Sequence, residues 1–199
     1  MSPLPSLRLR GRLQHDAVHG AWHDGPRRYL VLRPDSLMGA LRLLDAATRE
    51  TVFDALALSV QRHGGDSLRA YAAGVNGDAR ALIAATLDSA ADLGWGVWSL
   101  KQQGAALELT VQHSPFAAGW LAAGSDPHSD GLAVCAPIRG MLAALATALA
   151  GVPMQVHELR CAAQGHRECC FVAAPAPAPA AGGKGTPCSV AQRLPGHTQ

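Results

Sequence analysis

Apolar side chains recur every three or four residues in three stretches of the chain, which is the spacing of an amphipathic helix. The first stretch spans residues 36–65, and it places Val52, Leu56 and Val60 on one side. Gly64-Gly65 interrupts or ends this helix, and a shorter helical run resumes after the two glycines.

Two further helices are delimited by residues that are typical of helix ends. Asp78 is an N-cap type and Gly94 supplies a stop for the second helix. Pro137 suits a first helical position and Gly151 ends the third helix. The apolar faces of these two helices consist of Ile83, Leu87, Ala90 and Ala91, and of Ile138, Met141, Leu142, Leu145 and Leu149.

Strict alternation of apolar and polar side chains predicts β-strands in two neighbouring segments, residues 95–102 and 106–113. The turn "QQGA" between them predicts that the strands form an antiparallel hairpin. A loop over residues 114–131 follows the hairpin. One face of the second strand consists of Leu107, Leu109, Val111 and His113.

Shorter apolar segments near both ends of the chain complete the predicted elements. Residues 6–13 ("SLRLRGRL") and 27–34 ("RRYLVLRP") predict two N-terminal strands, and residues 154–159 and 169–174 predict two C-terminal strands. The resulting order is two strands, three helices, two strands, one helix and two strands. This order predicts an α+β fold, in which an antiparallel sheet packs against several helices and ends in a C-terminal β-hairpin.

Length and composition favour a single folded domain with appendages. A chain of 199 residues with 48% hydrophobic residues can bury one core. From residue 174 the chain alternates Ala and Pro and then turns to Gly, Ser and Thr, which predicts a disordered tail over residues 174–199 with Cys188 as an incidental thiol. We expect residues 1–24 to form an N-terminal strand or arm and residues 25–173 to form the folded domain.

Charge and hydropathy exclude two kinds of partner and indicate a compartment. The chain has 17 Lys and Arg against 15 Asp and Glu, and no basic run is typical of a phosphate-tracking surface, so we expect no nucleic-acid partner. No apolar stretch reaches the ~18 residues of a membrane span, and the N-terminus does not have the pattern of a secretory signal. We therefore expect no membrane partner and a cytoplasmic location, where thiols stay reduced.

Three of the five cysteines lie in one short segment, "VHELRCAAQGHRECCF", residues 156–171. A hairpin there could present Glu158, Cys161 and Cys169 to a single point. Cys135 could supply a fourth ligand, because it lies just before a helix start, where the helix dipole favours a thiolate. Four protein ligands would make a closed, structural zinc site.

Other assignments of the same segment stay open at this point. His157 or His166 could replace Glu158 as a ligand, whereas Cys170 faces away from Cys169 on a strand. A redox pair is disfavoured, because the segment has no C-x-x-C motif and a vicinal disulfide would be strained. The remaining alternative is that Cys135 and either Cys169 or Cys170 are ordinary buried residues of small apolar type.

The segments "HSPFAAGW" and "CAPIRGMLAALATALAGVPMQVHELRCAAQGHRECCF" resemble the 4-vinyl reductase (4VR) domain, and the resemblance extends over about residues 25–173. The same domain forms the N-terminal sensor of phenol- and xylene-responsive bacterial activators. The phenol sensors bind zinc through an upstream Cys and a Glu-x-x-Cys-x(7)-Cys hairpin. Glu158, Cys161 and Cys169 match this hairpin and Cys135 stands at the upstream position. The resemblance therefore implies a structural Zn²⁺ that clamps the hairpin, and a homodimer.

The resemblance also implies a buried, mostly apolar pocket for a small aromatic or hydrocarbon molecule, beside the zinc but not in contact with it. Aromatic side chains gather between residues 95 and 120 and support such a pocket. The candidate ligand-binding residues are Trp95, Trp98, His113, Phe116 and Trp120. The alternative is that these side chains belong to the core.

One departure limits what the resemblance carries over. The phenol sensors have Trp-x-Asn-Ser ahead of the loop, whereas this chain has "VQHS" with Val111 at the Trp position, so phenol specificity is not expected. We also expect no ATPase domain and no DNA-binding helix pair. The favoured function is a stand-alone carrier or sensor of a small apolar molecule.

Catalysis is not favoured by the motifs of the chain. A reductase needs a hydride donor, and the glycines of "GVNGDA", residues 74–79, open a helix after another helix, which is the wrong context for a dinucleotide fingerprint. If the chain is an enzyme, we expect a vinyl reductase. Two alternatives remain: an accessory protein of bacteriochlorophyll or tetrapyrrole synthesis, whose pocket would need about 1,000 Å³, and an assembly adaptor similar in fold to vesicle-tethering subunits.

Overall fold

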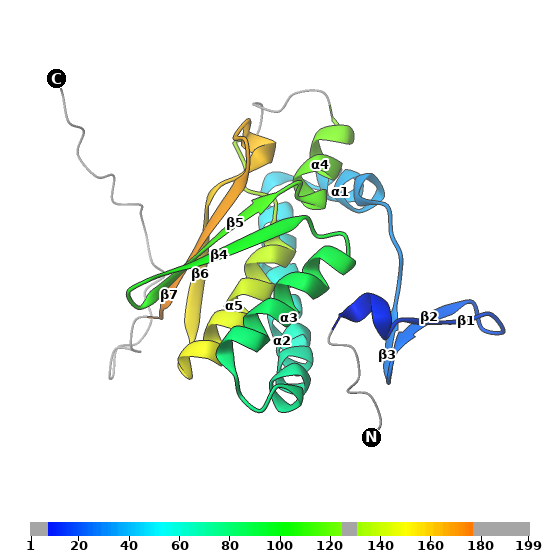
Figure 1. The fold of residues 1–199 in the computed structure, drawn as a ribbon. Coiled ribbons are helices and arrows are strands. Elements are labelled where there is room, and N and C mark those ends of the chain that lie inside the picture. The colour runs from blue at the N-terminus through cyan, green and yellow to red at the C-terminus, as the bar shows by residue number, and fades with distance from the viewer. Residues whose placement is uncertain (1–7, 125–130, 177–199) are drawn as a thin grey trace, which may run out of the picture.

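The computed structural model describes residues 8–124 and 131–176, which form an α+β fold with two antiparallel sheets (Figure 1). Its α-helices are α1 (Pro34–Arg42), α2 (Ala46–Gly74), α3 (Ala79–Asp92), α4 (Pro115–Ala122) and α5 (Ala136–Ala150). Its strands are β1 (Gln14–Asp16), β2 (Ala21–Asp24), β3 (Arg27–Tyr29), β4 (Val97–Gln103), β5 (Ala106–Gln112), β6 (Met154–Arg160) and β7 (Cys169–Pro175). The predicted fold class is confirmed.

The larger sheet has the strand order β4-β5-β7-β6, and every neighbouring pair is antiparallel. The helices cover one face of this sheet (Figure 1): α5 lies against β6 and β7, α3 lies against β4, and α2 packs along α5. The core lies between the two layers, where Leu109 of β5 pairs with Phe171 of β7 and both side chains are fully buried. Burial of this apolar face is the main contribution to the stability of the fold.

Close contact between α2 and α5 depends on a glycine. A Cβ atom on Gly140 of α5 would lie 2.2 Å from the carbonyl oxygen of Ala57 in α2, so only a residue without a side chain fits. The stripe of Leu and Ala on α5 is buried along this contact and against the sheet. The helix therefore forms an internal support of the domain.

Two predicted helix ends are confirmed and one predicted break is wrong. The Asp78 side chain accepts hydrogen bonds from the backbone N–H groups of Arg80 and Ala81 at the start of α3, and Gly151 ends α5 in the left-handed conformation. Gly64-Gly65, in contrast, does not interrupt α2, which is continuous from Ala46 to Gly74. Gly64 is buried against the side chain of Met141, and this packing offsets the roughly 1 kcal/mol that a glycine costs in a helix.

The predicted loop over residues 114–131 contains a helix. Ser114 caps α4, since its side-chain oxygen accepts a hydrogen bond from the N–H of Ala117, and Pro115 occupies the first turn. Phe116 and Trp120, which we placed in a loop, are therefore held on a helix. Residues 125–130 of the predicted loop lie outside the described residues.

The N-terminal arm differs most from the prediction. Residues 6–13 were expected to form a strand, but Leu9–Gly11 form a 3₁₀ helix in which Leu9 is buried. A small sheet of β1, β2 and β3 follows (Figure 1), and of residues 27–34 only 27–29 are in a strand. Alternation in short segments does not separate a strand from an apolar anchor, and here the side chain of Leu9 finds its partners in the helices.

Polar contacts attach the arm to α2 and α3. The guanidinium of Arg12 forms two hydrogen bonds of 3.1 Å with the carboxylate of Asp24 and a third of 2.9 Å with the hydroxyl of Tyr71 in α2. Arg8 forms an exposed ion pair with Asp88 of α3. The arm is thereby fixed against the helix layer on the side away from the large sheet (Figure 1).

The C-terminal end of the described chain differs slightly from the predicted boundary. Strand β7 continues to Pro175, two residues beyond the predicted end of the domain at residue 173. The remaining part of the predicted tail, with Cys188, lies outside the described residues. None of the helices in the described part combines the length and the apolar character that a membrane crossing requires.

The glycine contact generates a prediction with a built-in control. Gly140→Ala should destabilise the protein by about 1–3 kcal/mol, because the new methyl group overlaps the backbone of Ala57 and the two helices must separate. Gly65→Ala in α2 meets no atom closer than 3.6 Å and should raise stability by about 0.5–1 kcal/mol, since alanine favours the helix. Urea unfolding of both variants checks the opposite signs; equal stability of the two would contradict the close helix contact.

Candidate metal centre and ligand cavity

A bulge in β6 places two metal-binding side chains on the same face of the sheet. Glu158 pairs with Phe171 and Arg160 pairs with Cys170, so Leu159 is an extra residue between them. Without this residue Cys161, an odd number of positions after Glu158, would point to the opposite face. The bulge therefore explains why a Glu-x-x-Cys spacing can serve one centre.

The returning strand and the start of α5 supply the other two side chains. Cys169 opens β7 with its side chain on the buried face, and Cys135 is the residue immediately before α5. A turn of 3₁₀ helix between the strands is held by Gln164, which accepts a hydrogen bond from the N–H of Cys161 and donates one to the carbonyl of Gly131. The hairpin is thereby tied to the segment that precedes α5.

Four ligand atoms from Cys135, Glu158, Cys161 and Cys169 lie within 4.8 Å of one another. The sulfur of Cys135 is 3.7 Å from that of Cys161 and 3.6 Å from that of Cys169, and the third sulfur pair is 3.9 Å apart. A tetrahedral ion with metal–sulfur bonds of ~2.3 Å separates its sulfur ligands by about 3.8 Å. These separations match the edges of such a tetrahedron and are far longer than the ~2.05 Å of a disulfide, so the four residues could hold a metal ion.

The carboxylate of Glu158 completes the cluster. Its Oε2 atom accepts a 3.0 Å hydrogen bond from the backbone N–H of Cys135, which orients the group. Its Oε1 atom is buried and has no hydrogen-bond partner among the described residues. A buried carboxylate oxygen without a partner is costly, and a metal ion would satisfy it.

Burial and mutual contact shift the acidity of these groups in different directions. Burial raises the pKa of Glu158 to about 9, with the nearby Cys161 adding to the effect. Hydrogen bonds from Cys135 and Cys161 lower the pKa of the Cys169 thiol to about 4. Hydrogen bonds to the Cys161 and Cys169 sulfurs raise the pKa of Cys135. Four acidic groups in one buried site cannot all ionise next to one another, and a divalent cation would remove that repulsion.

Residues that could have replaced a ligand lie elsewhere. His157 and His166 are both exposed, the first on the outer face of β6 and the second in the hairpin loop. Cys170 points to the face opposite Cys169, with its sulfur 3.9 Å from a carboxylate oxygen of Glu108. Among the described residues, the clustered set is therefore the one that the spacing predicted.

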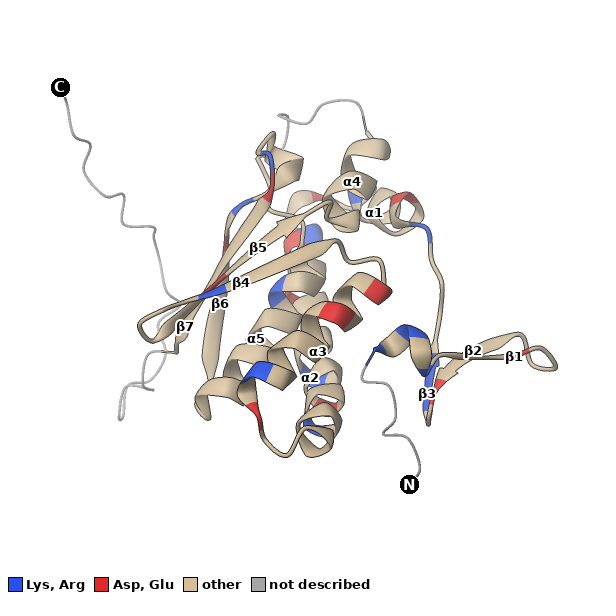
Figure 2. Ribbon diagram, in the orientation of Figure 1, with Lys and Arg blue, Asp and Glu red and all other residues tan. Residues whose placement is uncertain are grey.

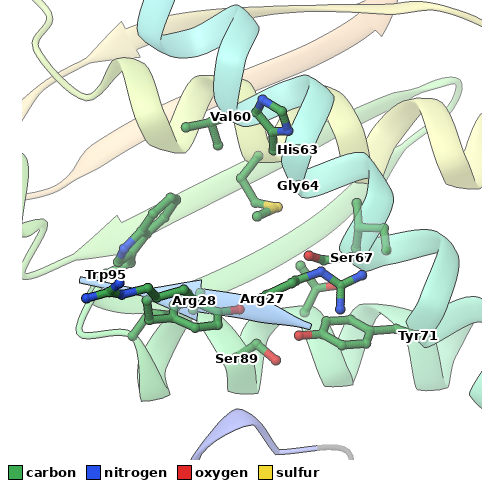
Figure 3. A pocket seen from close by; sticks show the side chains of 15 residues that line it. Arg27, Arg28, Val60, His63, Gly64, Ser67, Tyr71, Ser89 and Trp95 are labelled. Atoms are coloured by element: carbon green, nitrogen blue, oxygen red, sulfur yellow. The ribbon is translucent and has the colours of Figure 1, made fainter. Parts of the chain in front are cut away.

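A cavity of about 450 Å³ lies between β3, α2 and α3 (Figure 3). The lining comes from these three elements, from Trp95, and from Met141 of α5, and it is mostly apolar. None of the four clustered metal-binding residues lines it. Burial raises the pKa of Tyr29 in this wall, so its phenol group stays neutral at physiological pH.

Polar atoms in the wall differ in how well they are satisfied. The hydroxyl of Thr86 donates a 2.8 Å hydrogen bond to the carbonyl of Leu82, and the hydroxyl of Tyr71 accepts one from Arg12. The hydroxyl of Ser89 is buried and has no partner among the described residues. An unsatisfied buried hydroxyl in a cavity wall marks a position where a bound molecule can form a hydrogen bond.

Of the five aromatic and histidine residues predicted to bind a ligand, Trp95 alone lines this cavity. Trp98 and Phe116 are buried behind it: the Trp98 indole donates a 3.0 Å hydrogen bond to the carbonyl of Trp95, and the Phe116 ring meets the Trp95 ring edge-on at 5.4 Å. Both rings therefore support the cavity wall from within the core.

The other two predicted residues lie away from the cavity. Trp120 is buried, and the guanidinium groups of Arg42 and Arg49 lie 4.5 Å and 5.3 Å from its ring centroid. His113 is exposed and has a left-handed backbone with φ of 58°, because β5 ends at Gln112. The alternation that placed His113 on the inner face was extended one residue too far.

A second hollow, of about 620 Å³, borders Glu158 and is larger than the cavity but more polar. Its lining includes Glu50, Asp54, Arg139 and His157. Arg139 and Asp54 already form an ion pair of 2.6 Å. Because charged side chains in this hollow satisfy each other, the cavity beside β3 is the better site for an apolar molecule.

Sequence reasoning missed the residues that give the cavity its polar character. Ser89 carries no signal of its own in a helical pattern, and Arg27 and Arg28 were assigned to a strand of the main sheet. The unusual feature that could have drawn notice is the doubled arginine in the chain segment "PRRY" after a turn. Its position against α2 and α3 is a tertiary contact that no local pattern indicates.

Comparisons with solved structures place the fold. The phenol-responsive sensory domain of the transcription activator PoxR, in complex with phenol, superimposes with a TM-score of 0.69 at 18% identity, over 84% of this chain and 86% of that domain. A palmitate-bound trafficking protein particle complex subunit 3 from Naegleria fowleri gives 0.48 at 9% identity, over 72% and 95% of the two chains. A vinyl-4-reductase family protein from Methanocaldococcus jannaschii gives 0.45 at 12% identity, over 75% and 98%.

Sequence comparison identifies the region that contains the metal centre. No curated protein sequence matches the chain significantly. Residues 107–175, from β5 to the end of β7, match the family model of the 4VR (vinyl-4-reductase) domain. The four clustered side chains all lie within this region. The chain therefore carries a 4VR domain, the family that its cysteine hairpin resembles.

Proposed function

We propose that the chain is a cytoplasmic carrier or sensor that binds one small, largely apolar molecule in the cavity between β3, α2 and α3. The observation that carries this proposal is the cavity itself, a mostly apolar space of about 450 Å³ with one unpartnered hydroxyl, that of Ser89, in its wall. Ligand sites in proteins are concave, mostly apolar, and contain a few polar groups that fix orientation. The fold shared with a phenol-responsive sensory domain supports small-molecule binding as the role.

The size of the cavity favours a molecule of one or two rings, or a short chain. A tetrapyrrole would need about 1,000 Å³ or an open cleft, and the cavity is less than half of that volume. The role as an accessory protein of bacteriochlorophyll synthesis is therefore disfavoured. The cavity also favours binding over the role of an assembly adaptor, for which a filled interior is expected.

The metal in the proposed protein is a structural zinc ion held by Cys135, Glu158, Cys161 and Cys169. Three thiolates and a carboxylate suit zinc, and four protein ligands leave no position for water or substrate. The ion would join the start of α5 to the β6–β7 hairpin and stabilise this end of the domain. A closed site of this kind supports a binding protein without metal-dependent catalysis.

The proposed assembly is a homodimer that uses the N-terminal arm. The Leu- and Ala-rich face of α5 is buried inside the domain and is not available for a partner. Exposed large apolar side chains occur instead along the arm and the segment after it: Val18, Trp22, Leu30, Val31 and Leu32. Contact with a second copy would remove this apolar surface from water.

Removal of one ligand tests the zinc centre. Cys161→Ala should abolish zinc retention and lower the free energy of unfolding by several kcal/mol, as loss of a structural metal does. Cys170→Ala is the matched control, because its sulfur lies on the opposite face of β7, and this variant should keep its zinc. Metal analysis and thermal melts, with and without a chelator, measure both effects. A Cys161→Ala protein that retains one zinc ion and melts like the parent would disprove the structural role.

Native mass spectrometry of the protein purified from its own host tests the small-molecule site. We expect a retained molecule of a few hundred daltons besides zinc, in a two-chain assembly. Ser89→Leu should reduce the retained fraction, because the larger side chain fills the cavity and removes its hydroxyl. Ala91→Leu on the exposed side of the same helix should not. Retention that is equal in both variants would place the molecule outside the cavity.

A further inference from the structure

Strand β3 presents two neighbouring guanidinium groups to the cavity (Figure 3). Arg27 and Arg28 both line it, and Figure 3 shows the Arg28 side chain toward Trp95 and the Arg27 side chain toward Tyr71. His63 of α2 lines the same space. An apolar cavity of about 450 Å³ thus has three groups in its wall that carry or can accept positive charge.

The cavity wall contains no Asp or Glu that could neutralise these groups. The nearest carboxylates of the surrounding elements already have basic or N–H partners: Asp24 pairs with Arg12, Asp66 with Arg69, Asp88 with Arg8, and Asp92 with the N–H of Arg10. Figure 2 shows the resulting concentration of basic residues on β3 beside α2 and α3. The positive charge that faces the cavity is therefore not balanced from within its wall.

The two arginines differ in what they already bind. Arg27 donates a long hydrogen bond of 3.5 Å to the backbone carbonyl of Asp66. Arg28 forms no hydrogen bond or ion pair within residues 8–124 and 131–176. The Ser89 hydroxyl, on α3 across from β3, is the buried polar atom without a partner in the same wall. One uncommitted guanidinium and one uncommitted hydroxyl match a ligand group that accepts hydrogen bonds and carries a single negative charge.

We propose that the ligand of this cavity is a carboxylic acid with an aromatic or aliphatic body. Its carboxylate is received by Arg28, with Arg27 beside it, and accepts a hydrogen bond from Ser89. Its apolar body lies against Trp95, Val60 and Met141, which line the other side of the cavity. This inference rests on the proposed function, since it names the chemical class of the molecule that the same site binds.

A carboxylate would also join the arm to the body of the domain. Strand β3 belongs to the arm, whereas Ser89 belongs to α3. A charged group that contacts both elements adds an interaction to the few polar contacts, such as Arg12 with Tyr71, that attach the arm. Binding of the acid should therefore slow amide exchange in residues 21–29 more than binding of a neutral analogue does.

Matched probes of equal shape test the proposal by isothermal titration calorimetry on the full chain. We expect 2-naphthoate to bind at least about tenfold more tightly than 2-naphthamide or 2-naphthol, and we expect this preference to shrink at high salt. Hydrogen exchange of residues 21–29 with each probe gives an independent readout. A probe with a phosphate in place of the carboxylate should bind no more tightly than 2-naphthoate, because the wall offers one uncommitted guanidinium.

Charge variants identify the groups that recognise the carboxylate. In the double variant Arg27→Gln/Arg28→Gln the preference for 2-naphthoate over 2-naphthamide should disappear, while the affinity for 2-naphthamide stays the same. Arg62→Gln/Arg80→Gln removes the same charge from exposed positions on α2 and α3 that do not line the cavity, and it should keep the preference. Unchanged binding of 2-naphthamide shows that each variant is folded.

The possible failures are distinguishable. If 2-naphthol or 2-naphthamide binds as tightly as 2-naphthoate, or if the preference survives in the Arg27/Arg28 variant, the carboxylic acid is wrong but a small-molecule site remains. If the phosphate probe binds best, the head group is anionic but the carboxylate assignment is wrong. If none of the probes binds and the protein from its own host retains no molecule, both the head group and the proposed function are overturned.

Discussion

The extra residue in β6 is the local feature on which the metal centre depends. It turns Glu158 and Cys161, which an unbroken strand would direct to opposite faces, toward the same buried point. There they meet Cys169 of the next strand and Cys135 at the start of α5. Four acidic groups in one buried place are unfavourable without a cation, so strand irregularity and metal binding are two parts of one arrangement. The hydrogen bonds of Gln164 hold the turn that makes it possible.

Helix α5 connects this centre to the cavity. Cys135 stands at its start and Met141 lines the cavity, about 9 Å further along at a rise of 1.5 Å per residue. Between them Gly140 allows the backbone of α2 to approach closely, and α2 supplies a large part of the cavity wall. A metal ion that fixes the start of α5 therefore also fixes the distance between α5 and α2. Its effect on the cavity is mechanical, since none of its ligands lines that space.

Much of the fold and the whole metal cluster could be predicted from the sequence, because both follow from local patterns. Periodicity and capping residues such as Asp78 and Gly151 located helices, and ligand spacing located the hairpin. The errors occurred where tertiary packing overrides local preference: Gly64 lies inside a helix because Met141 packs on it, and Leu9 anchors a 3₁₀ turn. The cavity was misplaced for the same reason, since its wall is assembled from segments distant in the sequence.

The match to the 4VR domain and the identity of the ligand are carried by different parts of the chain. The match covers residues 107–175, which include three strands of the large sheet, α5 and the metal centre. The cavity wall is formed by residues between Arg27 and Trp95, and Met141 is the one lining residue inside the matched region. A domain of this family can therefore keep its metal-stabilised sheet while the arm, α2 and α3 change what the cavity accepts. Ligand chemistry in this chain has to be derived from its own cavity wall, where two arginines and a serine stand among apolar side chains, because the family match does not extend to those residues.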